Sequence, residues 1–284
     1  MPTTTTHKLF PAAPIHLPSD LSESQLLSFP AFQTWAKALH HNLSLQSNPS
    51  HPFHSSPYSL KSITIQSVDF FGNNKPGFIK LQSSISNSSG SSLPGSVLLR
   101  GGSTAILVLL QPSDAQDKDE IYTILTRQPR IPAASLDFAE LPAGMLDDSG
   151  AFAGKAAKEL EEETALTIDA DEVVDLTAAA LEGTEGEEDL KRAVYPSAGG
   201  CDEFVPLFAC RKRLPRTEME ELKGKLSGLR EEGEMITLKI VKLKDLWREG
   251  ARDAKALSAL ALYEGLQREG KLEGLFEKGK GAKM

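Results

Sequence analysis

The stretch "AGKAAKELEEETALTI" (residues 153–168) places four glutamates within five positions of a segment whose spacing predicts a packed helix. An α-helix turns about 100° per residue. Glu159, Glu162 and Glu163 therefore share one face, and Glu161 lies on the far side. The small and apolar residues of the segment fall on a separate stripe that can pack against a core. The pattern predicts a helix with a packed side and, beside it, a carboxylate side.

Carboxylates this close together repel one another unless positive charge lies among them. Lys155 and Lys158 lie near the carboxylate side and offset part of the repulsion. A hard divalent cation would satisfy the rest, because Mg²⁺ takes oxygen ligands. The alternative for any isolated run of this kind is a solvated, charged helix face.

The residues before the helix favour the metal-binding interpretation. "FAELPAGMLDDSG" (138–150) reads as an extended segment followed by Pro142, Gly144 and an acidic loop. With the helix, this stretch resembles the Nudix box, and the register holds without a gap. The matching positions are Gly144, Glu159, Leu160, Glu162, Glu163 and Leu166. The departing positions are Gly150 for Glu, Lys158 for Arg and Ala165 for Gly.

The departures differ in weight. Lys158 keeps the positive charge but lacks the bidentate fork that arginine offers a carboxylate. Gly150 removes one acidic group, while the carboxylate triplet is intact. The resemblance implies an α/β fold, a Nudix α/β/α sandwich preceded by a small N-terminal β-rich domain.

Segments outside the box resemble the nucleotide-sugar branch of the family, and the likeness covers roughly residues 22–270. They are "TRQPRIPAASLDFAELPAGMLDD", "YPSAGGCDEFVPLFACRKR", "GLREEGEMITLKIV", "DAKALSALALYE" and "ITIQSVDFFGNNKPGFIKL". The resemblance implies Mg²⁺-dependent hydrolysis, with Mn²⁺ possible, of ADP-ribose or ADP-glucose to AMP and a sugar phosphate. It also implies a homodimer that binds a small nucleotide sugar.

Two alternatives stay open. The same scaffold could hydrolyse another nucleoside diphosphate derivative, such as a dinucleotide or coenzyme A. A non-catalytic nucleotide-sugar sensor is the hypothesis from a different class, and Gly150 and Lys158 motivate it.

The resemblance also assigns the metal ligands and the catalytic groups. The metal ligands are Glu159, Glu162, Glu163 and the backbone carbonyl of Ala143, and Glu162 is also counted as catalytic. No histidine follows residue 54, so another group must act as the general base. In this branch a loop glutamate outside the box is the usual candidate. The loop "REEGE" makes Glu232 the first choice and Glu234 the second, with a solvated acidic turn as the alternative.

Five further residues are candidates for substrate binding. Arg130 suits the diphosphate because a guanidinium matches phosphate oxygens in a fork. Glu140 either binds substrate or caps a strand edge, and Glu203 is a possible ligand or orienting residue. Phe70 or Phe71 could stack on adenine, and burial in a core is the alternative for at least one of them.

The composition limits the class of protein. The chain has 284 residues and a formal net charge of −8, which argues against a nucleic-acid binder that works by a general basic field. Two cysteines do not form a disulfide scaffold. No apolar run approaches the ~18 residues of a membrane span, so no membrane partner is expected. A cytoplasmic location is expected, with an organelle not excluded.

The pattern along the chain predicts four parts. They are a flexible N-terminal arm (1–21), a helix plus β-rich dimerisation and substrate unit (22–96), the hydrolase domain (97–270) and a flexible tail (271–284). Later strands are expected at 173–181, 203–211 and 235–243, and helices at 216–227 and 253–268.

Overall fold

The computed structural model describes residues 3–146, 152–164, 166–184, 186–228 and 235–280, and the chain divides into two compact units. Unit 1 comprises Met1–Gly102, Thr184–Lys191 and Ser197–Phe204. Unit 2 comprises Ser103–Gly183, Arg192–Pro196 and Val205–Met284. The second unit contains the helix that carries the glutamates.

Unit 1 is a six-stranded sheet with two helices. The strands follow the order β1-β2-β3-β4-β5, and β6 also pairs with β4. They are β1 (Thr3–His7), β2 (Phe10–Leu17), β3 (Ser59–Phe71), β4 (Lys75–Ser86), β5 (Ser92–Leu93) and β6 (Ser96–Leu99). The helices are α1 (Glu23–Ser28) and α2 (Pro30–Ser44), which share one apolar cluster with the sheet. Pro30 ends the first helix and begins the second, because proline fits the first helical position.

Residues 3–17 differ from the expected loose arm, because they form β1 and β2. Ile15 is fully buried, and β2 pairs in parallel with β3 through Ile15 and Ile63. The Thr- and Pro-rich composition hid this strand pair, since its partner strand lies more than forty residues away along the chain.

Unit 2 is built on an eight-stranded mixed sheet in the order β11-β12-β7-β8-β14-β13, with β10 on β7 and β9 on β8. Its strands are β7 (Ser103–Pro112), β8 (Tyr122–Arg130), β9 (Ser135–Glu140), β10 (Ala143–Met145), β11 (Val174–Asp175), β12 (Leu207–Leu214), β13 (Leu226–Ser227) and β14 (Ile236–Lys242). Its helices are α3 (Phe152–Thr164), α4 (Leu176–Leu181), α5 (Arg216–Leu222), α6 (Leu246–Glu249), α7 (Ala254–Arg268) and α8 (Leu272–Lys280).

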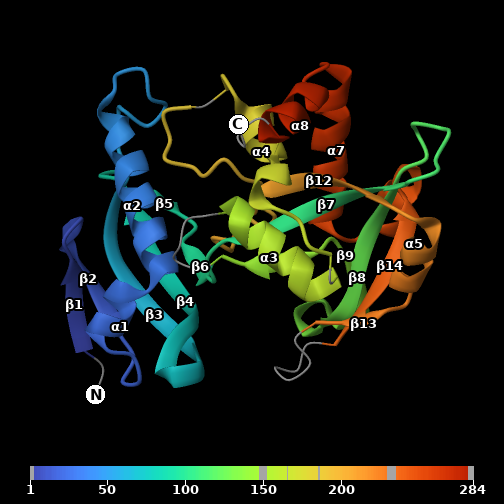
Figure 1. Cartoon of the computed structure of the whole chain (residues 1–284). Helices are drawn as coiled ribbons and strands as arrows, with labels where there is room; N and C mark the ends of the chain where they lie inside the picture. Colours follow the sequence, from blue (N-terminus) through green and yellow to red (C-terminus); the bar gives the residue numbers. More distant parts are fainter. Residues whose placement is uncertain (1–2, 147–151, 165, 185, 229–234, 281–284) are drawn as a thin grey trace. The chain divides into compact units, whose positions relative to one another are not determined.

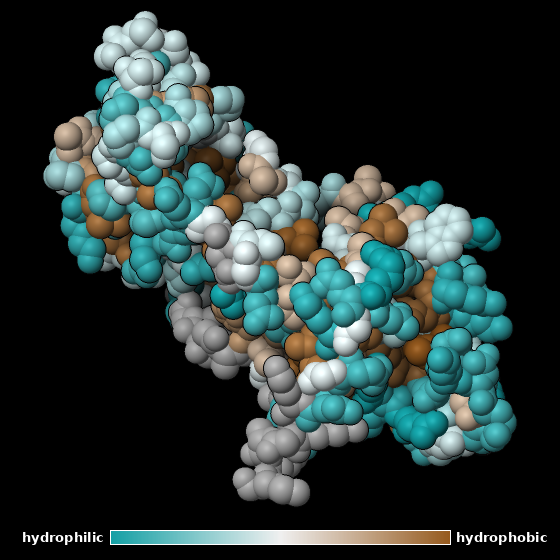
Figure 2. Space-filling view, turned by 90° about the horizontal axis from the view of Figure 1, so that it is seen from above, coloured by the Kyte–Doolittle hydropathy of each residue, from teal (hydrophilic) through white to brown (hydrophobic). Residues whose placement is uncertain are grey.

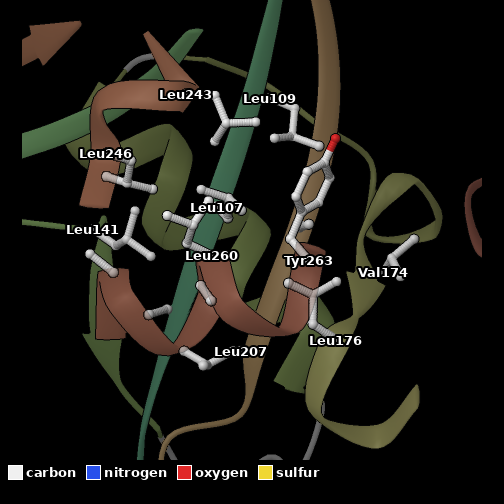
Figure 3. Packing of buried hydrophobic residues seen from close by; sticks show 14 of the residues in the cluster. Leu107, Leu109, Leu141, Val174, Leu176, Leu207, Leu243, Leu246, Leu260 and Tyr263 are labelled. Carbon is white, nitrogen blue, oxygen red and sulfur yellow. The ribbon is translucent and has the colours of Figure 1, made fainter. Parts of the chain in front are cut away.

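Helices cover both faces of this sheet (Figure 1). Strand β7 sends alternate side chains to opposite faces, as the period of two requires. Leu107 and Leu109 pack with α4, α6, α7 and α8, and Figure 3 shows Leu260 and Tyr263 of α7 against them. Ile106 and Val108 pack with α3 and α5 on the other face. The predicted α/β/α sandwich is thereby confirmed.

Three further elements differ from the expectations. The helix expected at 216–227 ends at Leu222 as α5, and Leu226–Ser227 form β13. The segment expected as a strand at 173–181 continues from the short β11 into α4, because the Asp175 carboxylate caps the helix by accepting from Ala178 N at 2.8 Å. The expected flexible tail contains α8, whose Leu272 and Phe276 are buried. The Arg211 guanidinium lies 4.1 Å from the Phe276 ring centroid. Tertiary packing therefore orders a segment that looks polar on its own.

The surface drawn in Figure 2 carries hydrophobic residues scattered between hydrophilic ones. Within the described parts of the chain, no helix is both long and apolar enough to cross a membrane.

Candidate functional site

The first glycine of the box makes room for the first box glutamate. A Cβ atom added at Gly144 would lie 1.8 Å from Cδ of Glu159, far inside any real contact distance. Gly144 belongs to β10, which pairs with β7 at Thr104. The helix α3 therefore lays the Glu159 carboxylate directly on the backbone of the strand, and only glycine permits that approach.

Glu163 lies at the buried side of the same contact. Its side chain is almost fully buried, and Oε2 accepts a hydrogen bond from the backbone N–H of Ala143 at 3.2 Å. Burial raises the pKa of Glu163 well above its usual range, and the charges of Glu159 and Glu140 raise it further. The Ala143 N–H and Arg130 offset only part of this effect. The neutral form of Glu163 is therefore favoured unless a further positive charge lies beside it.

The two other helix-face carboxylates pair with lysines one turn away. Lys155 Nζ lies 2.8 Å from Glu159 Oε1, and Lys158 Nζ lies 3.2 Å from Glu162 Oε1. The lysines offset the repulsion as the sequence predicts. Within the residues described, no three His, Cys, Asp or Glu side chains are gathered closely enough to hold a metal ion.

The donor chemistry nevertheless fits a hard divalent cation. The side-chain donors on this face are carboxylate oxygens, which suit Mg²⁺ or Mn²⁺ rather than a soft metal. Buried Glu163, with its raised pKa, is the group whose charge a divalent cation would balance. Glu159 and Glu162 keep 15% and 24% of their side chains exposed, so an ion can reach them.

Arg130 and Glu140, both predicted for substrate binding, contact each other. Arg130 Nε lies 2.6 Å from Glu140 Oε1. Lys255 Nζ lies 2.8 Å from Glu140 Oε2, so both carboxylate oxygens of buried Glu140 face cations of the chain. The Arg130 side chain stays 41% exposed and can still offer N–H groups to a ligand.

The sequence analysis did not identify Asp253 and Lys255. Asp253 is the N-cap of α7, a signal that an aspartate ahead of an apolar helix does provide. Its Oδ2 also accepts from the backbone N–H of Leu141 at 2.9 Å. That partner lies 112 residues away, and no local pattern reveals it.

The remaining predicted residues lie elsewhere or outside the described residues. Phe70, Phe71 and Glu203 belong to unit 1. Phe71 is 48% exposed and packs edge-on against Phe78, whereas Phe70 packs on the apolar cluster of unit 1. Glu203 forms an ion pair of 2.9 Å with Arg100. The positions outside the described residues are Glu232, Glu234, Gly150 and Ala165.

A hollow of about 860 Å³ lies on the other face of the unit 2 sheet, beside α6. Arg127 and Lys239 line it, and they follow the same alternation as Leu125 and Val241, which pack toward α6 and α7. None of the predicted site residues lines this hollow. The hollow is therefore separate from the contacts of α3 with β10.

Comparison with known proteins agrees with the resemblance of residues 144–166 to the Nudix box. No protein-family model matches the chain. The chain is 42% identical over 214 residues to Nudix hydrolase 14, chloroplastic, of Arabidopsis thaliana. The match covers 75% of this chain and 65% of that relative, so the chain spans just under two thirds of the relative's length.

A crystal structure of an ADP compounds hydrolase is similar at 18% identity and a TM-score of 0.45, over 75% of this chain and 98% of that one. A likeness at this level has no bearing on function. The chain is thus similar to a Nudix hydrolase, and its box is in register, with Glu159 laid on Gly144.

Proposed function

We propose that the chain hydrolyses the diphosphate bond of ADP-sugars such as ADP-ribose or ADP-glucose, giving AMP and a sugar phosphate, with Mg²⁺ or Mn²⁺ as cofactor. The observation that carries this proposal is the contact of α3 with β10. Glu159 lies on Gly144 and Glu163 is buried on the Ala143 N–H, so box carboxylates are held against one backbone segment.

Glu159, Glu162, Glu163 and the Ala143 carbonyl would hold the cation. When bound, the cation neutralises charge that builds on the phosphate oxygens during hydrolysis. Arg130, fixed through Nε by Glu140, offers its remaining N–H groups to the diphosphate of the substrate. Buried Glu140 is proposed to act on the substrate through Arg130, which it holds.

Proton transfer requires a base, and the chain has no histidine after residue 54. Glu232 is proposed to accept the proton of the attacking water, with Glu234 as the second candidate. A carboxylate can serve in this role when a loop places it within hydrogen-bond reach of the water.

Two residues of unit 1 are also proposed to bind the substrate. Exposed Phe71 is the better candidate of the two phenylalanines for stacking on adenine, because Phe70 packs on the core. Glu203 is proposed as an orienting group, and the active form is proposed to be a homodimer. The location is proposed to be the cytoplasm or an organelle, and the matched relative is named chloroplastic.

The test is AMP release from ADP-ribose and ADP-glucose, with Mg²⁺ and with EDTA. Glu162→Gln should reduce kcat by about 100-fold or more, since loss of a transition-state charge stabiliser has effects of this size. Glu161→Gln is the matched control on the exposed side of the same helix and should leave kcat unchanged. Equal turnover of both variants would contradict the proposal that Glu162 helps to bind the cation.

A non-catalytic sensor is the second candidate function. Lys158, which replaces the box arginine, pairs with Glu162 and could satisfy that carboxylate without a cation. Calorimetry with ADP-ribose and Mg²⁺ separates the two functions. Tight binding without AMP would support the sensor, and AMP formation would exclude it. A panel of dinucleotides and coenzyme A would test the other substrate class.

A further inference from the structure

We infer that Asp253 and Lys255, at the start of α7, are positioning residues that fix the 141–144 segment and the Arg130 guanidinium for catalysis. The inference rests on the proposed function and assigns new residues to the same site. Both side chains come from a helix on the face of the sheet opposite to α3.

Asp253 fixes the backbone that leads into Gly144. Its side chain is buried, and its two oxygens serve two elements. Oδ1 accepts from Lys255 N at 3.0 Å and caps α7, while Oδ2 accepts from Leu141 N at 2.9 Å. A charged acceptor makes these bonds stronger than neutral ones. The start of α7 and the end of β9 are therefore tied by one carboxylate.

The sequence of residues 141–143 explains why the hydrogen bond from Leu141 N–H to Asp253 is important. Pro142 has no N–H, so Leu141 and Ala143 carry the two donors that flank it. Leu141 N–H binds Asp253, and Ala143 N–H binds Glu163. The segment that presents the Ala143 carbonyl and Gly144 is thus pinned from α7 on one side of Pro142 and from α3 on the other.

Lys255 connects the same anchor to Arg130. Its Nζ lies 2.8 Å from Glu140 Oε2 and 3.0 Å from Asp253 Oδ1, and only 16% of its side chain is exposed. Burial alone would lower the pKa of Lys255, but the charges and hydrogen bonds of Asp253 and Glu140 raise it overall. The side chain is therefore a charged group at neutral pH.

Loss of Lys255 would change how Glu140 holds Arg130. Glu140 now divides its two oxygens between Arg130 and Lys255. Without Lys255, one buried oxygen would lack its partner, and the carboxylate would draw further N–H groups of Arg130 toward itself. Those are the groups that the diphosphate needs, so weaker substrate binding is the expected result.

A buried network that only stabilises the fold would behave differently from a positioning network. Breaking a network that only stabilises the fold lowers the melting temperature and leaves the substrate affinity of the folded protein unchanged. A positioning role changes KM and ligand affinity in variants that remain folded. The two roles are therefore separable by measuring affinity and stability on the same variants.

The experiment uses the full chain and four variants: Lys255→Met, Lys255→Arg, Asp253→Asn and, as control, Lys271→Met. Lys271 pairs with Glu269 beyond the other end of α7, with both side chains more than half exposed. The readouts are kcat and KM for ADP-ribose, the calorimetric Kd of a methylene-bridged ADP-ribose analogue, and the melting temperature.

Lys255→Met should raise KM and Kd by about tenfold or more, because breaking a buried pair leaves an uncompensated charge. Lys255→Arg should restore most of the affinity, and Lys271→Met should match the wild type. Asp253→Asn keeps an acceptor for Leu141 N–H but removes the charge next to Lys255. It should fold and still bind the analogue more weakly.

Wild-type KM and Kd in folded Lys255→Met and Asp253→Asn would overturn the inference, whatever their melting temperatures. Failure of Lys255→Met to fold would move the decision to Lys255→Arg and Asp253→Asn. Wild-type protein that releases no AMP from any ADP-sugar would instead overturn the proposed function, and the analogue Kd would still decide the role of Lys255.

Discussion

The two units bury polar groups in different ways. In the described part of unit 1 the buried polar side chains are His7, Ser83 and Gln46, with no carboxylate among them. The Gln46 amide donates to Leu43 O and Tyr58 O at 2.9 Å each and accepts from Tyr58 N at 2.7 Å. In unit 2, buried carboxylates surround the 140–144 segment, namely Glu140, Glu163 and Asp253.

This difference in buried polar groups suggests which part of the sequence is constrained by function rather than by stability. A satisfied amide in a core is compatible with stability alone. A buried charge has a desolvation cost of several kcal/mol, and well-packed apolar residues of the same volume would often be more stable. The described residues of unit 1 pack their sheet without a buried carboxylate. The charges concentrated beside Gly144 are those that the proposed site would require.

The largest expected effect comes from closing the space at Gly144. Gly144→Ala forces the Glu159 carboxylate off the strand, since the new Cβ would overlap its Cδ. We expect kcat/KM to fall by about 100-fold or more, because a displacement of about 1 Å in a catalytic group has effects of this order. Steady-state AMP release checks it.

The control for this variant lies in α3, the helix that carries Glu159. Gly154 of α3 has open space where a Cβ would go, and alanine is the better helix former. Gly154→Ala should raise stability by about 0.5–1 kcal/mol and leave kcat/KM unchanged. Equal loss of activity in both variants would show that α3 is merely sensitive to any change.

A smaller effect is expected from removing a buried charge. Glu163→Gln, measured in EDTA, should melt at a higher temperature than the wild type at neutral pH, by roughly 2–4 °C for about 1 kcal/mol. A raised pKa in the folded chain means that the ionised form of Glu163 costs stability there.

The stability difference between Glu163→Gln and the wild type should depend on pH in a defined direction. The cost is absent below the ordinary glutamate pKa of 4.5, where Glu163 is protonated in both states. It grows as the pH rises from there toward the raised pKa of the folded chain and is constant above that pKa. The advantage of Glu163→Gln should therefore shrink as the pH falls toward 4.5. A lower melting temperature for the variant at every pH would contradict the picture of an uncompensated buried charge.

The smallest expected effect is a difference in reactivity between the two cysteines, of which each unit contains one. Cys210 of β12 is fully buried, and burial raises its pKa to about 12. Cys201 of unit 1 is partly exposed, with a pKa that burial raises as well. Iodoacetamide at pH 8 should modify Cys201 slowly and Cys210 only after denaturation, as read by mass spectrometry. Native modification of Cys210 would show that the unit 2 core opens.

Local sequence determined much of the fold. The glutamate segment forms α3, and Lys155 and Lys158 pair with Glu159 and Glu162 as the helical spacing predicts. The strand expected at 235–243 and the helix expected at 253–268 match β14 and α7. These features depend on spacing within one element, which a sequence displays directly.

Contacts between distant segments could not be read in this way. Residues 3–17 form a hairpin of β1 and β2 that joins the sheet where β2 pairs with β3, and α8 docks its apolar side on unit 2. The link from Asp253 to Leu141 and from Lys255 to Glu140 joins residues more than a hundred positions apart. The substrate-binding role of Glu140 stays a prediction, and its two cationic partners follow from the tertiary fold alone.

The central claim is that the carboxylates of α3 stay together because they bind a divalent cation. Binding of Mn²⁺, followed by electron paramagnetic resonance of the free ion, tests it most directly. The wild type and Glu161→Gln should bind Mn²⁺ equally, while Glu159→Gln and Glu163→Gln should bind it about tenfold more weakly or worse. Equal Mn²⁺ binding by all four proteins, or binding by none, would contradict the claim.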